Sequence, residues 1–165
     1  MAAGADQEAQ IKAALQVTRM VAASFFMGVA LVYGLAVALI YGNPDKPGSQ
    51  TSPPVPLSAI GVGLAVLLTA GSFVAKGVLL KSARAQAEKT GKSLTALLAG
   101  YRVAVLVTLA LCEAGAFLIA VFVLVAGPEQ KAWLIAGLLP VLGMALHFPS
   151  RTGFDQLAAD LGSPR

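Results

Sequence analysis

One carboxylate, Glu113, stands near the centre of the long apolar run between Tyr101 and Gly127. An almost uniformly apolar run of about 25 residues is long enough to cross a bilayer as a helix. Arg102 marks one end of the run, and at ~1.5 Å per residue Glu113 lies about 16 Å deeper, in the middle of a ~30 Å hydrocarbon core. An aspartate at that depth costs about 2.5–3.5 kcal/mol on insertion scales, and we assume the same for glutamate. We therefore expect Glu113 to have a structural or functional use.

Three uses of Glu113 fit the sequence. As a link between helices, a protonated Glu113 is buried inside the bundle and bonds the second or fourth span, because lipid cannot solvate a carboxylate. Candidate partners at the same depth are Thr69 and Ser72 on the second span. On the fourth span, Pro140 leaves the carbonyl of Ala136 without its helical donor. The other two uses are an ion or proton relay and recognition of a partner in a larger complex.

A relay needs a second titrating group, and the one histidine of the chain, His147, is the candidate. It lies near the end of the fourth span, roughly 20 Å from Glu113 along the membrane normal. A lone histidine at that place is typical of an anchor at the membrane interface. Lys76, in the second span, is predicted to extend its ammonium group to the headgroups while its stem stays in apolar surroundings.

No pattern of catalytic or cofactor-binding residues is present in the sequence. One cysteine, Cys112, and one histidine cannot build a structural zinc site. The tetrapeptide at 90–93, Thr-Gly-Lys-Ser, resembles the tail of a P-loop. The first glycine of that motif would fall at Gln86, and no strand precedes it, which excludes nucleotide binding. The sequence therefore predicts a protein that is not an enzyme, with no catalytic residues, cofactor or metal.

The composition is that of an integral membrane protein. Of the 165 residues, 57% are hydrophobic and 12% charged, and the mean hydropathy is +0.77. A soluble domain averages about 25% charged residues. We predict an all-α polytopic membrane protein, a four-helix bundle formed by residues 1–165 as one domain. Its four transmembrane helices form two antiparallel hairpins, with spans at about 20–41, 57–80, 102–126 and 132–148.

The segments outside the spans are predicted to be loops and short helices. Residues 42–56 are rich in proline and form an outer loop. Residues 81–100 form a polar cytoplasmic link that breaks at Gly91. Short amphipathic helices are expected at both ends of the chain, one over residues 5–18 on the membrane surface and one that begins with a capping box at Thr152 and Asp155. The C-terminal helix presents Phe154 and Leu157 on one face.

Small residues recur along the first two spans. On the second span, Gly63, Ala70 and Gly77 lie seven residues apart and form one stripe. On the first span, small residues include Gly28 and Gly34. Small residues let helices approach closely where lipid supplies no hydrophobic drive. Such stripes exceed what one four-helix bundle needs for its own packing, which favours a protein that packs against others.

The distribution of basic residues predicts the orientation. If the spans alternate, the side with both termini and the link at 81–100 holds ten basic residues and the other side holds two: Lys12, Arg19, Lys76, Lys81, Arg84, Lys89, Lys92, Arg102, Arg151 and Arg165 against Lys46 and Lys131. Cytoplasmic loops carry the excess of Lys and Arg, so both termini are predicted to be cytoplasmic. The net charge of +4 serves membrane anchoring in this pattern, and no nucleic-acid partner is expected.

The second half of the chain resembles a group of small bacterial four-span membrane proteins without an established activity. The shared features are Tyr101-Arg102 at the start of the third span, the Leu-x-Glu-Ala/Gly core around Glu113, and Phe-Pro-x-Arg at 148–151. The resemblance covers roughly the last 65 residues and implies the bacterial cytoplasmic (inner) membrane. A looser likeness is to the proteolipid (c) subunits of rotary ATPases, which are small-residue hairpins with one carboxylate in the membrane. The chain departs from them because its tight turns face outward by charge and only Gly61-Val62-Gly63 matches the glycine repeat.

Two functional hypotheses follow from the sequence. The first is a small non-catalytic membrane protein that acts as a structural or accessory subunit of a larger bacterial membrane assembly. Its partners would be the lipid bilayer and either another membrane protein or further copies of the chain. The alternative is an ion- or proton-translocating subunit that uses Glu113. The candidate polar residues are Glu113, Thr69, Ser72 and His147.

Overall fold

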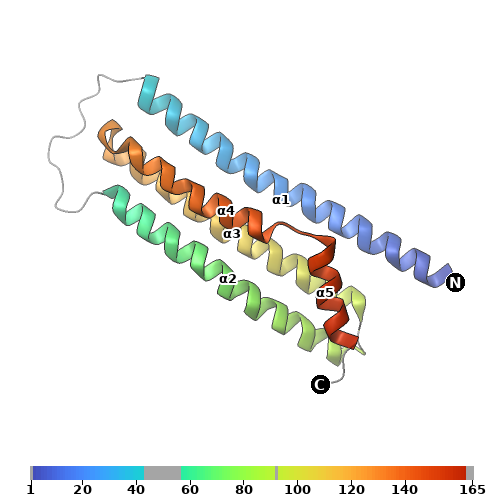
Figure 1. Cartoon of the computed structure of the whole chain (residues 1–165). Helices are drawn as coiled ribbons and strands as arrows, with labels where there is room; N and C mark the ends of the chain where they lie inside the picture. The colour runs from blue at the N-terminus through green and yellow to red at the C-terminus, as the bar shows by residue number, and fades with distance from the viewer. Residues whose placement is uncertain (1, 43–56, 92, 163–165) are drawn as a thin grey trace.

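The computed structural model describes residues 2–42, 57–91 and 93–162, and the regular elements in these residues are all helices. In chain order they are α1 (Ala2–Gly42), α2 (Leu57–Lys89), α3 (Leu94–Ala126), the 3-10 helix η1 (Pro128–Gly137), α4 (Leu138–His147) and α5 (Arg151–Gly162). The long helices run along one another, and α5 turns away at one end (Figure 1). The predicted all-α fold class is confirmed. Of the predicted outer loop at 42–56, only Gly42 lies within the described residues.

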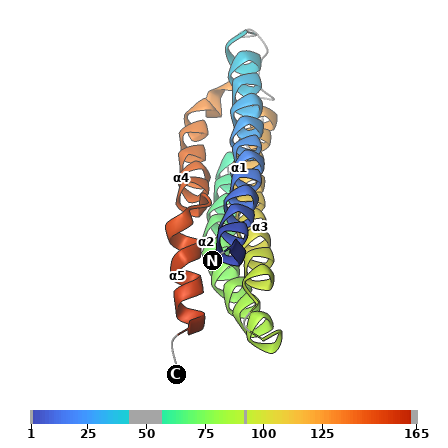
Figure 2. The ribbon, with the colours of Figure 1, turned by 90° about the vertical axis from the view of Figure 1, so that its right-hand side faces the viewer.

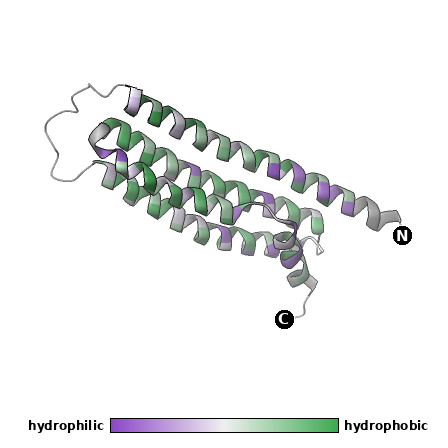
Figure 3. Cartoon of the chain, turned by 45° about the horizontal axis from the view of Figure 1, so that its top comes forward, coloured by the Kyte–Doolittle hydropathy of each residue, from purple (hydrophilic) through white to green (hydrophobic). Residues whose placement is uncertain are grey.

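Three of these helices, α1, α2 and α3, are long and apolar enough to cross a membrane. A fourth crossing is counted only if Gln130–His147 and Arg151–Ala159, which meet at an angle of 55°, are taken as one bent span. The apolar residues run along the bodies of the helices, and most hydrophilic residues gather toward the end of the bundle that holds both termini (Figure 3). This is the make-up of a multi-pass membrane protein.

The helices extend well beyond the predicted spans. No separate surface helix is present at 5–18, because α1 continues through this segment as one helix of 41 residues. The segment 81–89 is rich in alanine and in charged residues with high helix propensity, so it prolongs α2. Gly91, with φ of 73°, makes the turn, and the side chain of Ser93 accepts a hydrogen bond from the backbone of Ala96 to cap α3. The predicted link at 81–100 is therefore a short turn between two helical extensions.

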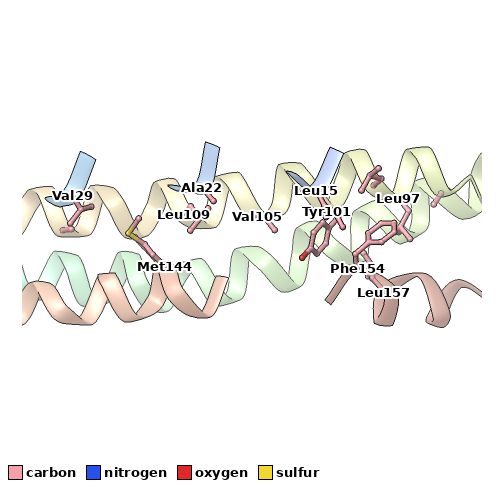
Figure 4. Packing of buried hydrophobic residues seen from close by; sticks show 14 residues of the cluster. Leu15, Ala22, Val29, Leu97, Tyr101, Val105, Leu109, Met144, Phe154 and Leu157 are labelled. Atoms are coloured by element: carbon pink, nitrogen blue, oxygen red, sulfur yellow. The ribbon is translucent and has the colours of Figure 1, made fainter. Parts of the chain in front are cut away.

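Helix α3 is the centre of the bundle. Buried residues make up 39% of its most apolar stretch, against 28% for α2 and 17% for α1. Helix α1 packs through one narrow seam with heptad-like spacing: Leu15, Thr18, Ala22, Val29, Ala36 and Ile40. Figure 4 shows Leu15, Ala22 and Val29 of this seam above the buried residues of α3. Most of the surface of α1 therefore points away from the rest of the chain.

Small residues bring α2 and α3 together. A Cβ on Gly61 would lie 2.8 Å from Cβ of Phe122, and one on Gly115 would lie 3.3 Å from Cα of Ala65. These contacts leave no room for a larger side chain, as expected for helices that pack closely in a membrane. The predicted stripe of Gly63, Ala70 and Gly77 does not take part, because all three residues are exposed.

The segment predicted as the fourth span consists of η1 followed by α4. The backbone N–H of Leu138 donates to the carbonyls of Ala136 and Ile135, and the bond to Ile135, three residues back, is of the 3-10 type. The 3-10 helix ends at Gly137, three residues before Pro140. Proline has no N–H and clashes with the preceding turn of an α-helix, so the tighter 3-10 winding before it has a local cause. The side chain of Gln130 at the start of η1 accepts a hydrogen bond from Ser58 at the start of α2.

Candidate functional site

A cluster of polar side chains is buried where α2, α3 and α4 meet. Ser72 Oγ lies 2.9 Å from Nε2 of His147, and Nζ of Lys76 lies 3.3 Å from Nδ1 of the same ring. The thiol of Cys112 donates to Ser72 Oγ at 3.5 Å. His147 is only 1% exposed, and Ser72 and Cys112 are fully buried. We call Ser72, Lys76, Cys112 and His147 the Ser72–His147 cluster.

The donor and acceptor roles in this cluster follow from its chemistry. The ammonium group of Lys76 can only donate, so Nδ1 of His147 accepts and Nε2 carries the hydrogen. Nε2 therefore donates to Ser72, whose hydroxyl in turn donates to the carbonyl of Thr69 at 2.6 Å. Lys76, His147 and Ser72 thus each donate to the next group, and the last acceptor is the backbone carbonyl of Thr69. In this arrangement His147 does not withdraw a proton from Ser72, which is what a nucleophilic serine would require.

The sequence predicted a membrane-interface anchor at His147, roughly 20 Å from Glu113. The predicted distance is too long, because His147 contacts Ser72, whose hydroxyl also contacts Cys112, the residue next to Glu113. Lys76, predicted to extend toward the headgroups, bonds the same histidine ring. The ring of His147 is packed at 4.5 Å between centroids against Phe73 and faces α2. Gly143, one turn earlier, allows this approach, since a Cβ there would lie 2.9 Å from Thr69 and 3.0 Å from Cys112. The sequence contained a sign of a polar contact on α2, because residues 69, 72 and 76 are polar and share one face of this helix at spacings of three and four.

Ser72 contacts Cys112, which agrees with the predicted register of the second span against Glu113. Ser72 bonds His147, and Thr69 lies beside Gly143 of the same helix. Thr69 is 5% exposed, and its Oγ1 has no hydrogen-bond partner among the described residues. Its methyl group lies against the position of Gly143. Ser72 and His147 thus connect α2 to α4, whereas Thr69 contributes packing and a backbone acceptor.

Glu113 lies apart from this cluster and against α1. A Cβ on Gly28 would lie 2.6 Å from Oε1 of Glu113, so the absence of a side chain at Gly28 makes room for the carboxylate. The predicted contact with α2 or α4 is replaced by this contact because Cys112 occupies that side, and the next residue of a helix points about 100° away. Glu113 is half-buried and forms no hydrogen bond with another described residue.

A second set of contacts joins the helices around the bend between α4 and α5. Nε of Arg19 donates to the carbonyl of Pro149 at 3.1 Å, and the hydroxyl of Tyr101 donates to the carbonyl of Ser150 at 3.2 Å. Arg151 forms an ion pair with Glu8 of α1 at 3.0 Å. Residues 101 and 148–151, which carried the resemblance to small bacterial membrane proteins, therefore meet in one place. The sequence did not indicate the part of Arg19.

Helix α5 packs against the beginning of α3 at this bend. The ring of Phe154 lies 5.7 Å from that of Tyr101. Phe154 and Leu157, which were predicted to share one face of this helix, are both buried. The predicted cap at Thr152 is shifted, because Oγ of Ser150 accepts the N–H of Gly153 at 3.0 Å. Asp155 instead pairs with Arg151 at 3.5 Å.

The described part of the chain contains no group of three or more His, Cys, Asp and Glu side chains that could hold a metal ion. Comparison of the chain with protein-family models, curated proteins and solved structures gives no match. The geometry is therefore the basis for the functional inference.

Proposed function

We propose that this chain is a small non-catalytic integral membrane protein that serves as a structural or accessory subunit of a larger assembly in the bacterial cytoplasmic membrane. The observation that carries this proposal is that the carboxylate of Glu113, predicted from the sequence to lie at mid-membrane depth, forms no hydrogen bond with any described residue. Burying a polar group in lipid without a partner is unfavourable, so a donor from another subunit would stabilise the membrane-inserted state.

The surroundings of Glu113 support a partner on the outer side of α3. Val103, Val107 and Val121 form an exposed apolar face of α3 that lies within about 80–120° of Glu113 around the helix. A helix that covers this face and carries a hydroxyl, amide or basic side chain would reach the carboxylate. A hydrogen bond from the partner helix to Glu113 would make this helix contact specific, whereas apolar packing alone discriminates poorly between partners.

The small-residue stripe on α2 supports a second helix contact. Gly63 and Gly77 are exposed, and a Cβ at either position would meet nothing within 4 Å. Ala70 lies between them on the same exposed face. Glycine lowers helix propensity by about 1 kcal/mol relative to alanine. Two outward glycines fourteen residues apart, with Ala70 midway between them, are thus better explained by close approach of another helix than by contact with lipid.

Four crossings with cytoplasmic termini complete the proposal. The ten residues of η1 at ~2.0 Å each and the ten of α4 at ~1.5 Å each extend about 35 Å, enough for a ~30 Å core. The N-terminal part of α1, the α2–α3 turn and α5 lie at one end of the bundle (Figure 2). That end carries most of the basic residues, which supports its location in the cytoplasm. The resemblance of residues 101–102 and 148–151 to small bacterial membrane proteins supports the inner membrane.

The experiment is isolation of the tagged chain from its own membrane in a mild detergent, followed by size measurement and mass spectrometry. We expect a particle larger than the monomer that contains a second membrane protein or further copies of the chain. Glu113→Leu should release that partner, and Leu142→Val, an exposed position on α4, should not. A monomer without any retained protein would contradict the proposal.

Translocation of ions or protons is the second candidate function, and the half-exposed position of Glu113 between α1 and α3 favours it. A carboxylate on an outer flank can take and release a proton at a subunit boundary, as the looser likeness to rotary-ATPase proteolipids implies. The test is proton flux in liposomes that contain the purified chain. Flux that is present in the wild type and lost in Glu113→Gln would favour this function over the accessory role.

A further inference from the structure

An apolar groove of about 540 Å³ opens between α1 and α4 and is lined by Ala23 and Phe26 of α1 and by Ala145 and Phe148 of α4. Pockets of ~300–1,000 Å³ are typical of small-molecule sites. The rings of Phe26 and Phe148 lie edge to face at 6.2 Å between centroids. The two alanines leave the groove open. An aliphatic chain is the natural complement to such walls.

Arg19 lies at one end of this groove and is fixed there. It is four residues before Ala23 and seven before Phe26, so the three residues share one face of α1. Its Nε donates to the carbonyl of Pro149, the residue that follows Phe148. This bond ties the guanidinium group to both walls of the groove and leaves its terminal nitrogens available.

The charge at this end of the groove is not neutralised within the described part of the chain. Arg19 is exposed and forms no ion pair with a described carboxylate, whereas the nearby Arg151 is paired with both Glu8 and Asp155. Lys12, seven residues before Arg19, adds a second exposed positive charge on the same face of α1. An arginine with free terminal nitrogens binds phosphate well, because two parallel hydrogen bonds can form.

We propose that the groove between α1 and α4 binds an anionic phospholipid, with its phosphate on Arg19 and an acyl chain between Phe26 and Phe148. The inference rests on membrane insertion and not on the accessory role. The lining residues span only about one turn on each helix, too short a strip for a whole helix to dock. An acyl chain beside a phosphate matches both the apolar groove and the charge at its end, and the cytoplasmic leaflet supplies anionic lipids.

The experiment is native mass spectrometry of the full-length chain, titrated with phosphatidylglycerol or phosphatidylcholine of the same acyl chains. We expect tighter retention of phosphatidylglycerol. Arg19→Gln should weaken that retention about tenfold, because hydrogen bonds to a charged group are lost. Ala145→Trp should weaken binding of both lipids, because the indole fills the groove. Lys81→Gln, which removes an exposed charge from the same end of the bundle, should have no effect.

Circular dichroism and detergent elution volume decide whether each variant is folded. If Arg19→Gln fails to fold, Arg19→Lys keeps the charge but loses the planar fork, and we expect an intermediate affinity. Equal retention of the two lipids by the wild type would overturn the proposal, as would equal loss in the Arg19 and Lys81 variants. Retention of a protein that Ala145→Trp releases, with lipid binding unchanged, would show a different occupant and overturn it as well.

Discussion

At the scale of single residues, the polar groups of the apolar region fall into two kinds. Ser72, Lys76 and His147 satisfy one another between α2 and α4. Glu113 has no such partner among the described residues and lies on the flank of the α1–α3 seam. The first kind holds the chain together, and the second kind is available to something outside it. The proposed function depends on this difference.

The link between Ser72 and His147 should be measurable as a coupling energy. Ser72→Ala should lower the free energy of unfolding by about 0.6–1.7 kcal/mol, the range of hydrogen bonds between membrane helices. His147→Ala should lower it by about 2–4 kcal/mol, because it also leaves a cavity. Unfolding in a denaturing detergent measures both, and the double variant should lose less than the sum. Ser24→Ala is the control, since that exposed hydroxyl bonds only the carbonyl of Val21 in its own helix.

If the double variant lost the full sum of the two single losses in unfolding free energy, the proposed coupling between Ser72 and His147 would be contradicted. An equal loss of unfolding free energy in Ser24→Ala and Ser72→Ala would also contradict it, because the loss would then come from the change in helix propensity and not from the contact with His147.

The level of α2 against α3 could be predicted from the sequence, whereas the level of His147 and the direction of Glu113 could not. The rise of an α-helix placed Ser72 and Glu113 at one level, and the contact of Ser72 with Cys112 agrees with that register. Packing decides which face of α3 turns toward α2. Cys112 takes that face, and the next residue, Glu113, therefore points toward α1. The contacts of His147 with α2 could not be predicted, because a lone histidine gives no sign of its partners on another helix.

At the scale of elements, the interface between α2 and α3 is set by positions without room for a side chain. Gly61 and Gly115 are covered by α3 and α2 respectively, whereas Gly63 and Gly77 face outward. The small-residue pattern predicted close helix approach but not which small residues would face α3.

The lengths of the helices were underestimated for another reason. Polar residues at 81–89 and 5–18 keep high helix propensity, so the helices continue past the apolar spans.

Substitution of the two kinds of glycine should separate folding from assembly. Gly61→Val should lower the free energy of unfolding of the isolated chain by about 1–3 kcal/mol, because its Cβ meets Phe122. Gly77→Val should leave the isolated chain unchanged and reduce retention of the proposed partner. Unfolding in detergent and co-purification measure the two effects. A destabilised Gly77→Val monomer would mean that the outward glycines serve the bundle itself.

At the scale of the whole molecule, most hydrophilic residues lie at the end of the bundle that holds both termini (Figure 3). The basic residues Lys12, Arg19, Lys81, Arg84, Lys89 and Arg151 belong to the helix segments at this end. The charge distribution predicted this arrangement from the sequence, and the arrangement of the helices agrees with it. Orientation in a membrane remains part of the proposal.

The orientation can be tested with an impermeant thiol reagent on intact cells. We expect a cysteine introduced at Ser49 in the predicted outer loop to be labelled, because that loop lies outside by charge. Lys89→Cys, at the end of α2, should be protected until the cells are opened. The native Cys112 is fully buried and gives a low background. Labelling of Lys89→Cys in intact cells, without labelling at Ser49, would reverse the topology.

The central claim, that the flank of Glu113 faces another protein, is tested most directly by photocrosslinking from α3 in living cells. A photoreactive residue at Ala114, which is exposed and adjacent to Glu113, should form an adduct with a second polypeptide, identified by mass spectrometry. The same residue at Leu142 on α4 should not form that adduct, and Glu113→Leu should abolish it. If Ala114 captures no protein in the wild type, or captures the same protein equally well in Glu113→Leu, the account is contradicted.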